Sequence, residues 1–491
     1  MFEAAELGRT ISKEDYEAQL PKLRAGLVNA QFRLRSSQLP VIIIVTGADG
    51  AGKGDVVHRL NEWLDPRGID TQAFWLSSDE EEERPPYWRF WRVLPARGRI
   101  GVFFGSWYTQ PMVRRLAGKI KRHELDAELD RIAGFERMLV EDGAIIIKLW
   151  LHLPAKEQAR RFRDVEKNPE KHWRILPTDW HSPKLHSRFR DLSERALRHT
   201  DSAAAPWQVI EAGDDRYRDL TVGQRVLAAL TAALTRKVKG PASTRARRTQ
   251  AVAAGVTVLD RVDLSQSLSE GDYERKLEKF QTKLQRLTWA AQEKKLSTVL
   301  VFEGWDAAGK GSSIRRVTEA IDPRLFRIIP VASPTDEERA HHYLWRFWRH
   351  LPRAGMIRIY DRSWYGRVLV ERVEGYAREE EWKRAYREIN DFEEQLVEDG
   401  MVLGKFWLHI SKAEQLRRFK QREEVAFKRY KITPDDWRNR AKWEQYGAAV
   451  NEMVRRTSTK SAPWTLVAGN DKKFARIQIL KTICRSLEEV L

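Results

Sequence analysis

The sequence predicts a tandemly duplicated α/β protein, in which each copy is a parallel β-sheet covered by helices. Two observations predict this fold class. The chain repeats its own motifs at one constant offset, and within each copy short apolar runs alternate with helical patterns. Strands that alternate with helices form parallel sheets that are buried on both faces, so each copy is expected to have three layers.

The repeat is clearest at a glycine-rich loop, where GADGAGKG at Gly47–Gly54 returns as GWDAAGKG at Gly304–Gly311. The offset, which is the difference between the numbers of Lys310 and Lys53, is 257. The same offset joins three further pairs of motifs: Trp88–Arg92 and Trp345–Arg349, Ser106–Tyr108 and Ser363–Tyr365, and Val140–Gly143 and Val397–Gly400. A constant register over this span indicates a duplicated domain.

The two copies are separated by residues 236–255. This stretch is rich in basic and small residues and shows no apolar period, which is typical of a linker. We therefore divide the chain into a first copy at residues 1–235, the linker, and a second copy at residues 256–491.

Each copy shows the same order of elements. Apolar residues recur every three to four positions at 16–27 and 273–287, which predicts an opening amphipathic helix. Apolar strands follow at 41–45 and 298–302, and each leads into a glycine loop and a second helix. Further elements are predicted in the second copy: strands at 356–360 and 401–408, and helices at about 378–398 and 411–425. Ligands of such sheets bind at the carboxyl ends of the strands, where the glycine loops lie.

Composition and charge narrow the class of protein. A single cysteine, Cys484, excludes an internal disulfide framework and a cysteine-based zinc cluster. No apolar run approaches the roughly 20 residues of a membrane span, and the first residues, MFEAAELGRT, lack the pattern of a secretion signal, so a soluble cytoplasmic protein is expected. The net charge of +18 attracts polyanions, such as nucleic acid, an anionic membrane surface or a phosphorylated substrate.

The glycine loop of the second copy has the P-loop pattern Gly-x-x-x-x-Gly-Lys between a strand and a helix. Its phosphate-binding residues are predicted to be the following: Gly304, Ala308, Gly309, Lys310 and Gly311. Backbone N–H groups, the helix N-terminus and the lysine would all face the phosphates. A tight glycine turn is the alternative, and the double occurrence in the same context favours phosphate binding. Since Gly311 replaces the usual magnesium-binding Ser or Thr, Asp306 is the predicted metal ligand.

A second candidate group follows the apolar strand Ile357–Tyr360, which runs directly into Asp361 and Arg362. An acidic residue at the end of a neighbouring strand is similar to the Walker-B aspartate, which faces the phosphates and helps to hold magnesium. The alternative is a strand-end aspartate that caps a turn, and the P-loop upstream favours the catalytic interpretation. Arg362 would then neutralise charge in the transition state.

The segment LRRFKQREEVAFKRYK, Leu416–Lys431, holds seven cationic residues. Such a density of charge after the last core strand suits a helical lid that closes over phosphate, although an exposed helix would also account for it. Trp364 and Tyr365 could stack a base, but we expect core packing. His152 and His409 end matching strands without partner ligands at metal spacing, so we expect structural roles.

Only the second copy carries the complete set of candidates. At the constant offset, Asp361 corresponds to Phe104 and Arg362 to Gly105. Three further pairs differ: Arg367 and Gln110, Glu371 and Arg114, and Arg422 and Val165. The first copy keeps its loop but lacks the second carboxylate, and a metal ligand that neutralises charge is therefore missing. Residues 1–235 are predicted to form a degenerate copy without catalytic activity.

Four motifs of the second copy together resemble the polyphosphate kinase 2 family: EGWDAAGKG (Glu303–Gly311), YDRSWYGRVLVERVEG (Tyr360–Gly375), GKFWLHISKAEQLRRF (Gly404–Phe419) and SAPWTLVAGNDKKFARI (Ser461–Ile477). The resemblance covers essentially the whole second copy and, more weakly, the first. The duplication is similar to the two-domain polyphosphate:AMP phosphotransferase type, and so is Gly366, where diphosphate-using members typically have Asn.

The resemblance implies a P-loop kinase-like fold with a helical lid. It also implies that the terminal phosphoryl group of inorganic polyphosphate passes to AMP, giving ADP, with magnesium or manganese as the cofactor. The implied roles of single residues are as follows: Asp306 and Asp361 hold the metal, Lys310 and Arg362 stabilise the transferring group, Arg418, Arg422, Lys428 and Arg429 line the polyphosphate path, and Arg367 and Glu371 are candidate nucleotide-binding residues.

Two other classes of protein share parts of this pattern. An ATP-dependent nucleotide kinase would have the same loop and lid and would differ in its phosphate donor. A nucleic-acid-binding P-loop protein would bind DNA or RNA in a salt-sensitive way without turnover, and the Asp361–Arg362 pair argues against it. We expect neither a nucleic-acid nor a membrane partner. The sequence leaves open GMP, ADP or GDP as acceptors, the polyphosphate chain length, the direction of the reaction and the oligomeric state, a homo-oligomer included.

Overall fold

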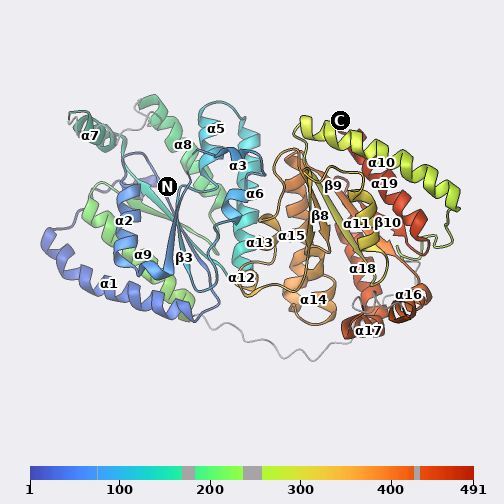
Figure 1. The fold of residues 1–491 in the computed structure, drawn as a ribbon. Coiled ribbons are helices and arrows are strands. Elements are labelled where there is room, and N and C mark those ends of the chain that lie inside the picture. The colour runs from blue at the N-terminus through green and yellow to red at the C-terminus, as the bar shows by residue number, and fades with distance from the viewer. Residues whose placement is uncertain (75, 168–182, 236–256, 425–431) are drawn as a thin grey trace. The chain divides into compact units, whose positions relative to one another are not determined.

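The computed structural model describes the chain except residue 75 and residues 168–182, 236–256 and 425–431 (Figure 1). The predicted linker, residues 236–255, therefore lies outside the described residues. Backbone contacts divide the chain into two compact units: a first unit of Met1–Ser77, Arg89–Arg245 and Asp336–His342, and a second unit of Ser78–Trp88, Ala246–Thr335 and Tyr343–Leu491. Each sequence copy thus contributes one short segment to the unit that is formed mainly by the other copy.

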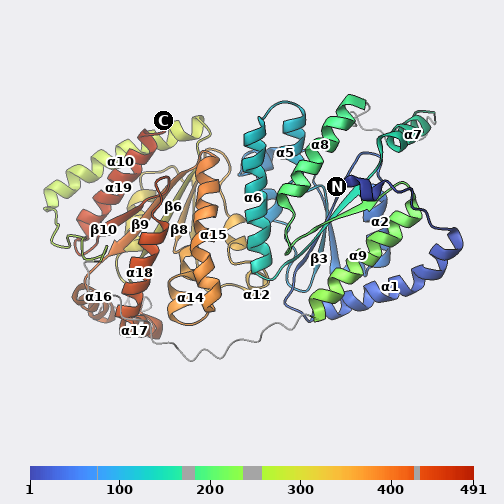
Figure 2. The ribbon, with the colours of Figure 1, turned by 180° about the vertical axis from the view of Figure 1, so that it is seen from behind.

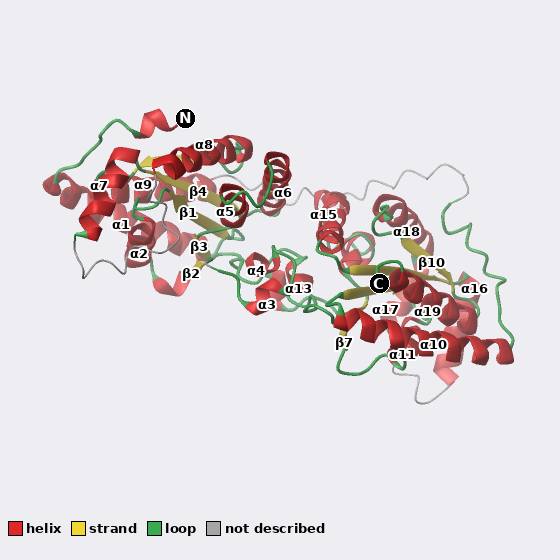
Figure 3. Ribbon diagram, turned by 90° about the horizontal axis from the view of Figure 1, so that it is seen from above, coloured by secondary structure: helices red, strands yellow, loops and turns green. Residues whose placement is uncertain are grey.

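The first unit is built on a parallel sheet of five strands in its described residues. These strands are β1 (Val41–Gly47), β2 (Ile69–Ala73), β3 (Ile100–Phe104), β4 (Ile145–His152) and β5 (Trp207–Glu211). Their order in the sheet is β2-β3-β1-β4-β5. Parallel neighbours need long crossover connections, which helices provide, and the helices form a layer on each face of the sheet (Figure 3).

The helices of the first unit follow the predicted alternation with strands. They are α1 (Lys13–Arg35), α2 (Lys53–Trp63), α4 (Trp88–Trp91), α5 (Thr109–Leu116), α6 (Arg122–Glu141), α7 (Ala155–Glu166), α8 (Pro183–Thr200) and α9 (Asp215–Thr235), with short 3-10 helices at Phe2–Ala5 and Pro66–Gly68. Helices α1, α2 and α9 pack together, and α6 packs with α8 on the other side of the sheet (Figures 1 and 2).

The second unit repeats this architecture with a second five-stranded parallel sheet. Its strands are β6 (Thr298–Gly304), β7 (Phe326–Pro330), β8 (Ile357–Asp361), β9 (Val402–His409) and β10 (Trp464–Ala468). Their order is β10-β9-β6-β8-β7, which is the order of the first sheet when it is read from the other edge. The predicted fold class, a tandem α/β protein with two parallel sheets, is therefore confirmed.

The remaining helices are α3 (Asp79–Glu82), α10 (Glu270–Glu293), α11 (Lys310–Thr318), α12 (Asp336–Arg339), α13 (Trp345–Trp348), a 3-10 helix at Trp364–Arg367, α14 (Val370–Val373), α15 (Glu379–Glu398), α16 (Lys412–Glu424), α17 (Pro434–Ala441), α18 (Trp443–Thr457) and α19 (Lys472–Glu488). Of these helices, α15 and α16 lie within one residue of their predicted bounds, and α10 extends beyond the predicted 273–287 at both ends. No helix in the described ranges is both long and apolar enough to cross a membrane.

Strand β6 occupies the centre of the second sheet, between β8 and β9. The chain continues from β6 to one side and later returns to the other, so the strand order reverses there. Ligands of open parallel sheets bind at the carboxyl end of the strands at such a reversal. The register pairs Phe302 of β6 with both Asp361 of β8 and Phe406 of β9. The glycine loop after β6 and the Asp361 segment after β8 therefore emerge at the same edge.

Each unit contains the same buried polar cluster beneath its sheet. In the second unit, Lys405 Nζ donates to Glu393 Oε2 at 2.6 Å and to the hydroxyl of Tyr365 at 2.9 Å. Trp364 Nε1 also donates to Glu393, at 3.0 Å. Both aromatic side chains are fully buried, which confirms the expectation that they pack in the core. Lys148 and Glu136 form the same ion pair in the first unit, at 2.8 Å.

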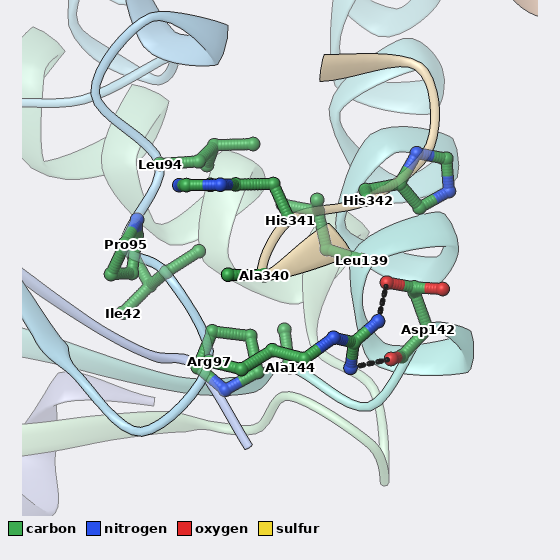
Figure 4. Close-up of a pocket in the computed structure, with 11 residues that line it drawn as sticks. Ile42, Leu94, Pro95, Arg97, Leu139, Asp142, Ala144, Ala340, His341 and His342 are labelled. Carbon is green, nitrogen blue, oxygen red and sulfur yellow. Dashed lines mark hydrogen bonds and ion pairs between the residues drawn. The ribbon is translucent and has the colours of Figure 1, made fainter. Parts of the chain in front are cut away.

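The segment Asp336–His342 is bound to the first unit through its backbone. The N–H group of Arg97 donates to the carbonyl oxygen of Ala340 at 2.8 Å, and the Arg97 guanidinium forms an ion pair with Asp142 at 2.9 Å (Figure 4). The space enclosed by these residues is about 20 Å³. That volume holds about one water molecule, so this recess is too small for a nucleotide or a phosphate chain.

Candidate active site

The glycine loop of the second unit joins β6 to α11 through a backbone that few residues can adopt. A side chain at Gly304, which has φ +151°, would place its Cβ 2.6 Å from the carbonyl oxygen of Leu408 on β9. Ala307 also has a positive φ, of 62°, which is strained for a residue with a side chain. Strain of this kind is held in place by the surrounding contacts and is concentrated at functional sites.

Lys310 begins α11 and turns back over the loop. Its Nζ donates to the carbonyl oxygens of Gly304 at 2.8 Å and Trp305 at 3.2 Å. Burial lowers the pKa of the Lys310 ammonium. In the part of the chain that the structure describes, Lys310 forms no ion pair with a carboxylate. Its charge is therefore available to an anion at the loop.

Asp361 ends β8 and Arg362 follows it, at the same edge of the sheet. Arg362 has φ +66°, and its guanidinium approaches Asp306 of the loop, with Nη2 3.3 Å from Oδ1. Asp361 lines a recess of about 290 Å³ together with residues of α11 and β7: Gly311, Ile314, Arg315, Thr318 and Ile328. The fold thus brings together the loop and the Asp361–Arg362 pair, two groups that are about fifty residues apart in the sequence.

The carboxylates of Asp306 and Asp361 fit the requirements of a magnesium ion that is bound partly by substrate. Magnesium usually takes one or two carboxylates together with phosphate oxygens and water. Within the described ranges, Asp361 makes no side-chain hydrogen bond, and no group of three or more His, Cys, Asp or Glu side chains could hold a metal alone. The donor set therefore suits a metal that arrives with phosphate and not a closed protein cage.

Glu303, which was not among the predicted site residues, lies directly behind the loop. Its side chain is buried and accepts a hydrogen bond of 2.8 Å from the hydroxyl of Ser363. Burial raises the pKa of Glu303 to about 7, and the nearby Lys310 offsets only part of this shift. One signal could have identified it from the sequence, because the first copy has Thr46 at this position and the two copies therefore differ here.

Arg418 on α16 occupies a different place from that expected of a lid residue. Its side chain is 3% exposed. Its N–H groups donate to the carbonyl oxygens of Ala307 and Ala308 at 3.0 and 2.9 Å, and to those of Gly469 and Asn470 at 2.7 and 2.9 Å. A guanidinium whose donors are shared among backbone carbonyls supports the glycine loop from within the protein.

Of the other predicted lid residues, the structure describes only Arg422. Arg422 lies half-buried near the end of α16. Lys428 and Arg429 lie outside the described residues. A contact between any of these side chains and polyphosphate stays a prediction.

The candidate nucleotide-binding residues Arg367 and Glu371 lie close together after β8. They form an ion pair of 3.2 Å, and both are partly exposed. The Arg367 guanidinium also lies over the ring of Tyr343, 4.5 Å from its centre. This arrangement offers a cation, a carboxylate and an aromatic ring in one place, and nucleotide binding there stays a prediction.

The glycine loop of the first unit is neutralised by its own residues. Lys53 Nζ forms an ion pair with Asp49 Oδ1 at 2.8 Å. Arg218, which is 1% exposed, packs so closely that a Cβ at Gly52 would lie 1.9 Å from its Nη1. At the position equivalent to Asp361, the first copy has Phe104, which lies at the end of β3. This loop keeps the backbone of a phosphate site but lacks the second carboxylate and an unpaired lysine.

The two histidines at matching strand ends take part in packing. His409 Nδ1 accepts a hydrogen bond of 3.0 Å from Trp305 Nε1, and burial lowers the pKa of His409 to about 4. His152 stacks on Phe2, with 4.4 Å between ring centres, and its Nε2 lies 2.8 Å from a carboxylate oxygen of Glu6. These contacts agree with the structural roles that we expected.

Comparisons with known proteins agree with this picture. The polyphosphate kinase 2 family model matches residues 10–238 and 267–490. Polyphosphate:AMP phosphotransferases are similar over the full length: that of Pseudomonas aeruginosa is 50% identical over 99% of both chains, and that of Acinetobacter johnsonii is 37% identical over 95% of this chain and 96% of its own.

Related proteins with other acceptors in their names match about half of the chain. The NDP-polyphosphate phosphotransferase 3 of Ruegeria pomeroyi is 41% identical over 44% of this chain and 72% of its own length. Among solved structures, a polyphosphate kinase 2 from Pseudomonas aeruginosa superposes with a TM-score of 0.89 at 49% identity, and covers 100% of this chain and 99% of that one. The chain therefore belongs to the polyphosphate kinase 2 family and carries two domains of that family in tandem.

Proposed function

We propose that this protein is a polyphosphate:AMP phosphotransferase, which transfers the terminal phosphoryl group of inorganic polyphosphate to AMP and gives ADP. The observation that carries the proposal is the extent of similarity. Relatives named polyphosphate:AMP phosphotransferase match both domains, over 95 to 100% of this chain. Relatives named for nucleoside diphosphates match only 44 to 46% of it.

The second unit is the proposed catalytic unit. Phosphoryl transfer depends mainly on positioning and on charge stabilisation, because the transition state spreads its charge over the oxygens of the transferred group. Lys310 at the loop and Arg362 after β8 would stabilise that charge. Both approach the edge of the sheet where Asp361 lies. Their fixed positions cost no reorganisation during the reaction.

Asp306 and Asp361 are the proposed ligands of a magnesium or manganese ion. When bound, the metal would neutralise charge on the phosphate oxygens. The residues of this chain would orient it, since the Asp306 carboxylate is held by Arg362 and Asn439 and Asp361 lies at the end of β8. A metal that binds with the substrate would need only these two carboxylates from the protein.

Arg422, Lys428 and Arg429 are proposed to contact the polyphosphate chain, and Arg367 and Glu371 the nucleotide. We propose that the net charge of +18 serves this linear polyanion and not nucleic acid or a membrane surface. The protein would then work in the cytoplasm. The first unit, whose loop lysine is paired with Asp49, would have a structural or regulatory role.

One assay tests the proposed reaction. Purified protein is incubated with magnesium, long-chain polyphosphate and AMP, and ADP and ATP are separated over time. We expect ADP to appear from AMP, and no ADP when magnesium is left out. If no ADP forms from AMP, the assignment of AMP as the acceptor is wrong. Faster formation of ATP from ADP would assign the protein to the diphosphate-using members of the family. Efficient use of ATP in place of polyphosphate would instead indicate an ordinary nucleotide kinase.

A further inference from the structure

The two glycine loops contain the same aspartate and lysine but pair them differently. In the first unit, Lys53 and Asp49 form an ion pair of 2.8 Å. In the second unit, the equivalent Lys310 donates to two backbone carbonyls. Asp306, which is the counterpart of Asp49, has other partners. Since the aspartate and the lysine are the same and have the same spacing in both loops, the difference must come from the groups around them.

Two donors other than the lysine hold the carboxylate of Asp306. Arg362 Nη2 lies 3.3 Å from Oδ1, and Asn439 Nδ2 donates to Oδ2 at 2.9 Å. Asn439 lies on α17, more than a hundred residues after the loop. The side chain of Asp306 is only 15% exposed, so little water competes with these two hydrogen bonds.

Asn439 is in turn linked to a buried carboxylate through the hydroxyl of Tyr446. The hydroxyl of Tyr446 lies 3.2 Å from both Asn439 Oδ1 and Glu374 Oε1. Glu374 is 4% exposed and forms ion pairs with Lys442 at 2.7 Å and Arg438 at 3.2 Å. Three residues of α17, α18 and the turn between them therefore meet at one carboxylate, and this fixes the place of Asn439.

A stacked pair of indoles fixes the same segment against the loop. The rings of Trp305 and Trp443 are 3.8 Å apart between centres and nearly parallel, at 10°. Trp305 belongs to the loop and Trp443 is the first residue of α18. Stacked aromatic pairs stabilise beyond the area that they bury, so the loop and the start of α18 are held as one body.

The first copy has other residue types at these positions. Asn439 corresponds to Ser182, which lies outside the described residues. At the constant offset, Glu374, Tyr446 and Trp305 correspond to Ala117, Phe189 and Ala48. Trp443 corresponds to His186, which bonds to Gln158. Among the described residues, the carboxylate of Asp49 has Lys53 as its partner and no such support.

We propose that Asn439 is a positioning residue that holds the carboxylate of Asp306 away from Lys310, and that Glu374 anchors Asn439 for this task. Without Asn439, Asp306 turns onto Lys310 as Asp49 does onto Lys53. The lysine charge is then neutralised within the loop and attracts phosphate less strongly. This inference rests on the proposed function of the loop as the phosphate site.

The test measures binding of tripolyphosphate in the absence of metal, by calorimetry on the full-length chain. The variant Asn439→Ala should weaken binding about tenfold. In an Asp306→Asn background, the same substitution should have no effect, because an amide in place of the carboxylate cannot neutralise Lys310. A general distortion of α17 would weaken binding equally in both backgrounds, and that result would overturn the proposal.

Further variants separate positioning from folding. Asn451→Ala on α18 removes an asparagine that bonds to Gly447 and Leu259, and it should leave tripolyphosphate binding unchanged. Glu374→Gln and Tyr446→Phe should each weaken binding less than Asn439→Ala, and neither should weaken it further when combined with Asn439→Ala. Additive losses would show that Glu374 and Tyr446 act independently of Asn439.

The binding measurements on these variants do not depend on catalytic turnover. If the wild-type chain forms no ADP from AMP, the proposed function fails. The metal-free binding measurements on the single and double variants still decide whether Asn439 acts on Asp306. If turnover is found, Asn439→Ala should raise the KM for polyphosphate and leave the KM for AMP unchanged. A crystal structure of Asn439→Ala with Asp306 in its original place, and no ion pair to Lys310, would also overturn the proposal.

Discussion

The hydroxyl of Ser363 donates a hydrogen bond of 2.8 Å to Glu303, and this bond joins the carboxyl ends of β8 and β6. Ser363 directly follows Asp361 and Arg362, and Glu303 directly precedes the glycine loop. The two halves of the candidate site are thus connected through a buried carboxyl group. Burial raises the pKa of this carboxyl group to about 7, which makes the connection sensitive to pH.

The stability of the chain should depend on pH through Glu303. The pKa of Glu303 is about 7 in the folded chain, against 4.5 for an unperturbed glutamate. Between these values the folded chain binds more protons than the unfolded chain, so the free energy of unfolding falls as the pH rises. The loss is at most about 3 kcal/mol, and Glu303→Gln should abolish it. Denaturation by urea from pH 4.5 to 8 checks this, and parallel curves for both proteins would contradict it.

The two loop lysines should differ in their contribution to activity. Lys310 carries an unpaired charge among the described residues, whereas Lys53 is neutralised by Asp49. Lys310→Ala should lower kcat/KM by at least about 100-fold, the effect of removing one donor that stabilises transition-state charge. Lys53→Ala should leave most of the activity. Rates of ADP formation from AMP check this, with circular dichroism to confirm that both variants fold. Equal losses would contradict the assignment of catalysis to the second unit.

The buried pair Lys405–Glu393 should stabilise the fold without contributing to the reaction. Burial raises the pKa of Glu393 and lowers that of Lys405, so each charge depends on its partner. Lys405→Ala should destabilise the second unit by roughly 3–5 kcal/mol, the cost of a buried charge without a partner. The double variant Lys405→Met/Glu393→Gln should recover part of this loss, because no charge is then buried. Thermal denaturation checks both, and a double variant that is less stable than Lys405→Ala would contradict this account.

The sequence was sufficient to predict the fold and to place the glycine loop and Asp361 at one edge of the sheet. A constant offset of 257 residues aligns every strand of the two sheets, and local apolar patterns place β6, β8 and β9 within one or two residues. Since parallel strands end at a common edge, the glycine loop and Asp361 had to lie near one another. Both predictions depend on local periodicity and topology, which a sequence shows directly.

The sequence could not show the contacts that distant segments make with the loop. The packing of Asn439 and Glu374 depends on the complete fold. Asn439 stands in none of the four motifs, and the motif that contains Glu374 shows no contact with Asp306. The exchange of Ser78–Trp88 and Asp336–His342 between the units also depends on tertiary contacts alone. Arg418 was grouped with its basic neighbours because a count of charges does not distinguish a buried cation from an exposed one.

Arg418 should therefore act on the shape of the loop and not on the polyphosphate chain. Its guanidinium bridges the carbonyl oxygens of Ala307 and Ala308 to those of Gly469 and Asn470. A lysine has one donor centre and cannot bridge two pairs of carbonyls. Arg418→Lys should thus lose nearly as much activity as Arg418→Ala, up to about 100-fold, because a misplaced loop misaligns the reacting groups.

Kinetics with polyphosphates of several lengths separate this role from that of a lid residue. A side chain that contacts the chain along its path should matter more for long polyphosphates, and this is the behaviour expected of Arg422→Ala. The loss in Arg418→Ala should be the same for short and long chains, because the glycine loop binds only the phosphates near the transferred group. A loss in Arg418→Ala that grows with chain length, or rescue of activity by Arg418→Lys, would show that its charge acts on the polyphosphate directly.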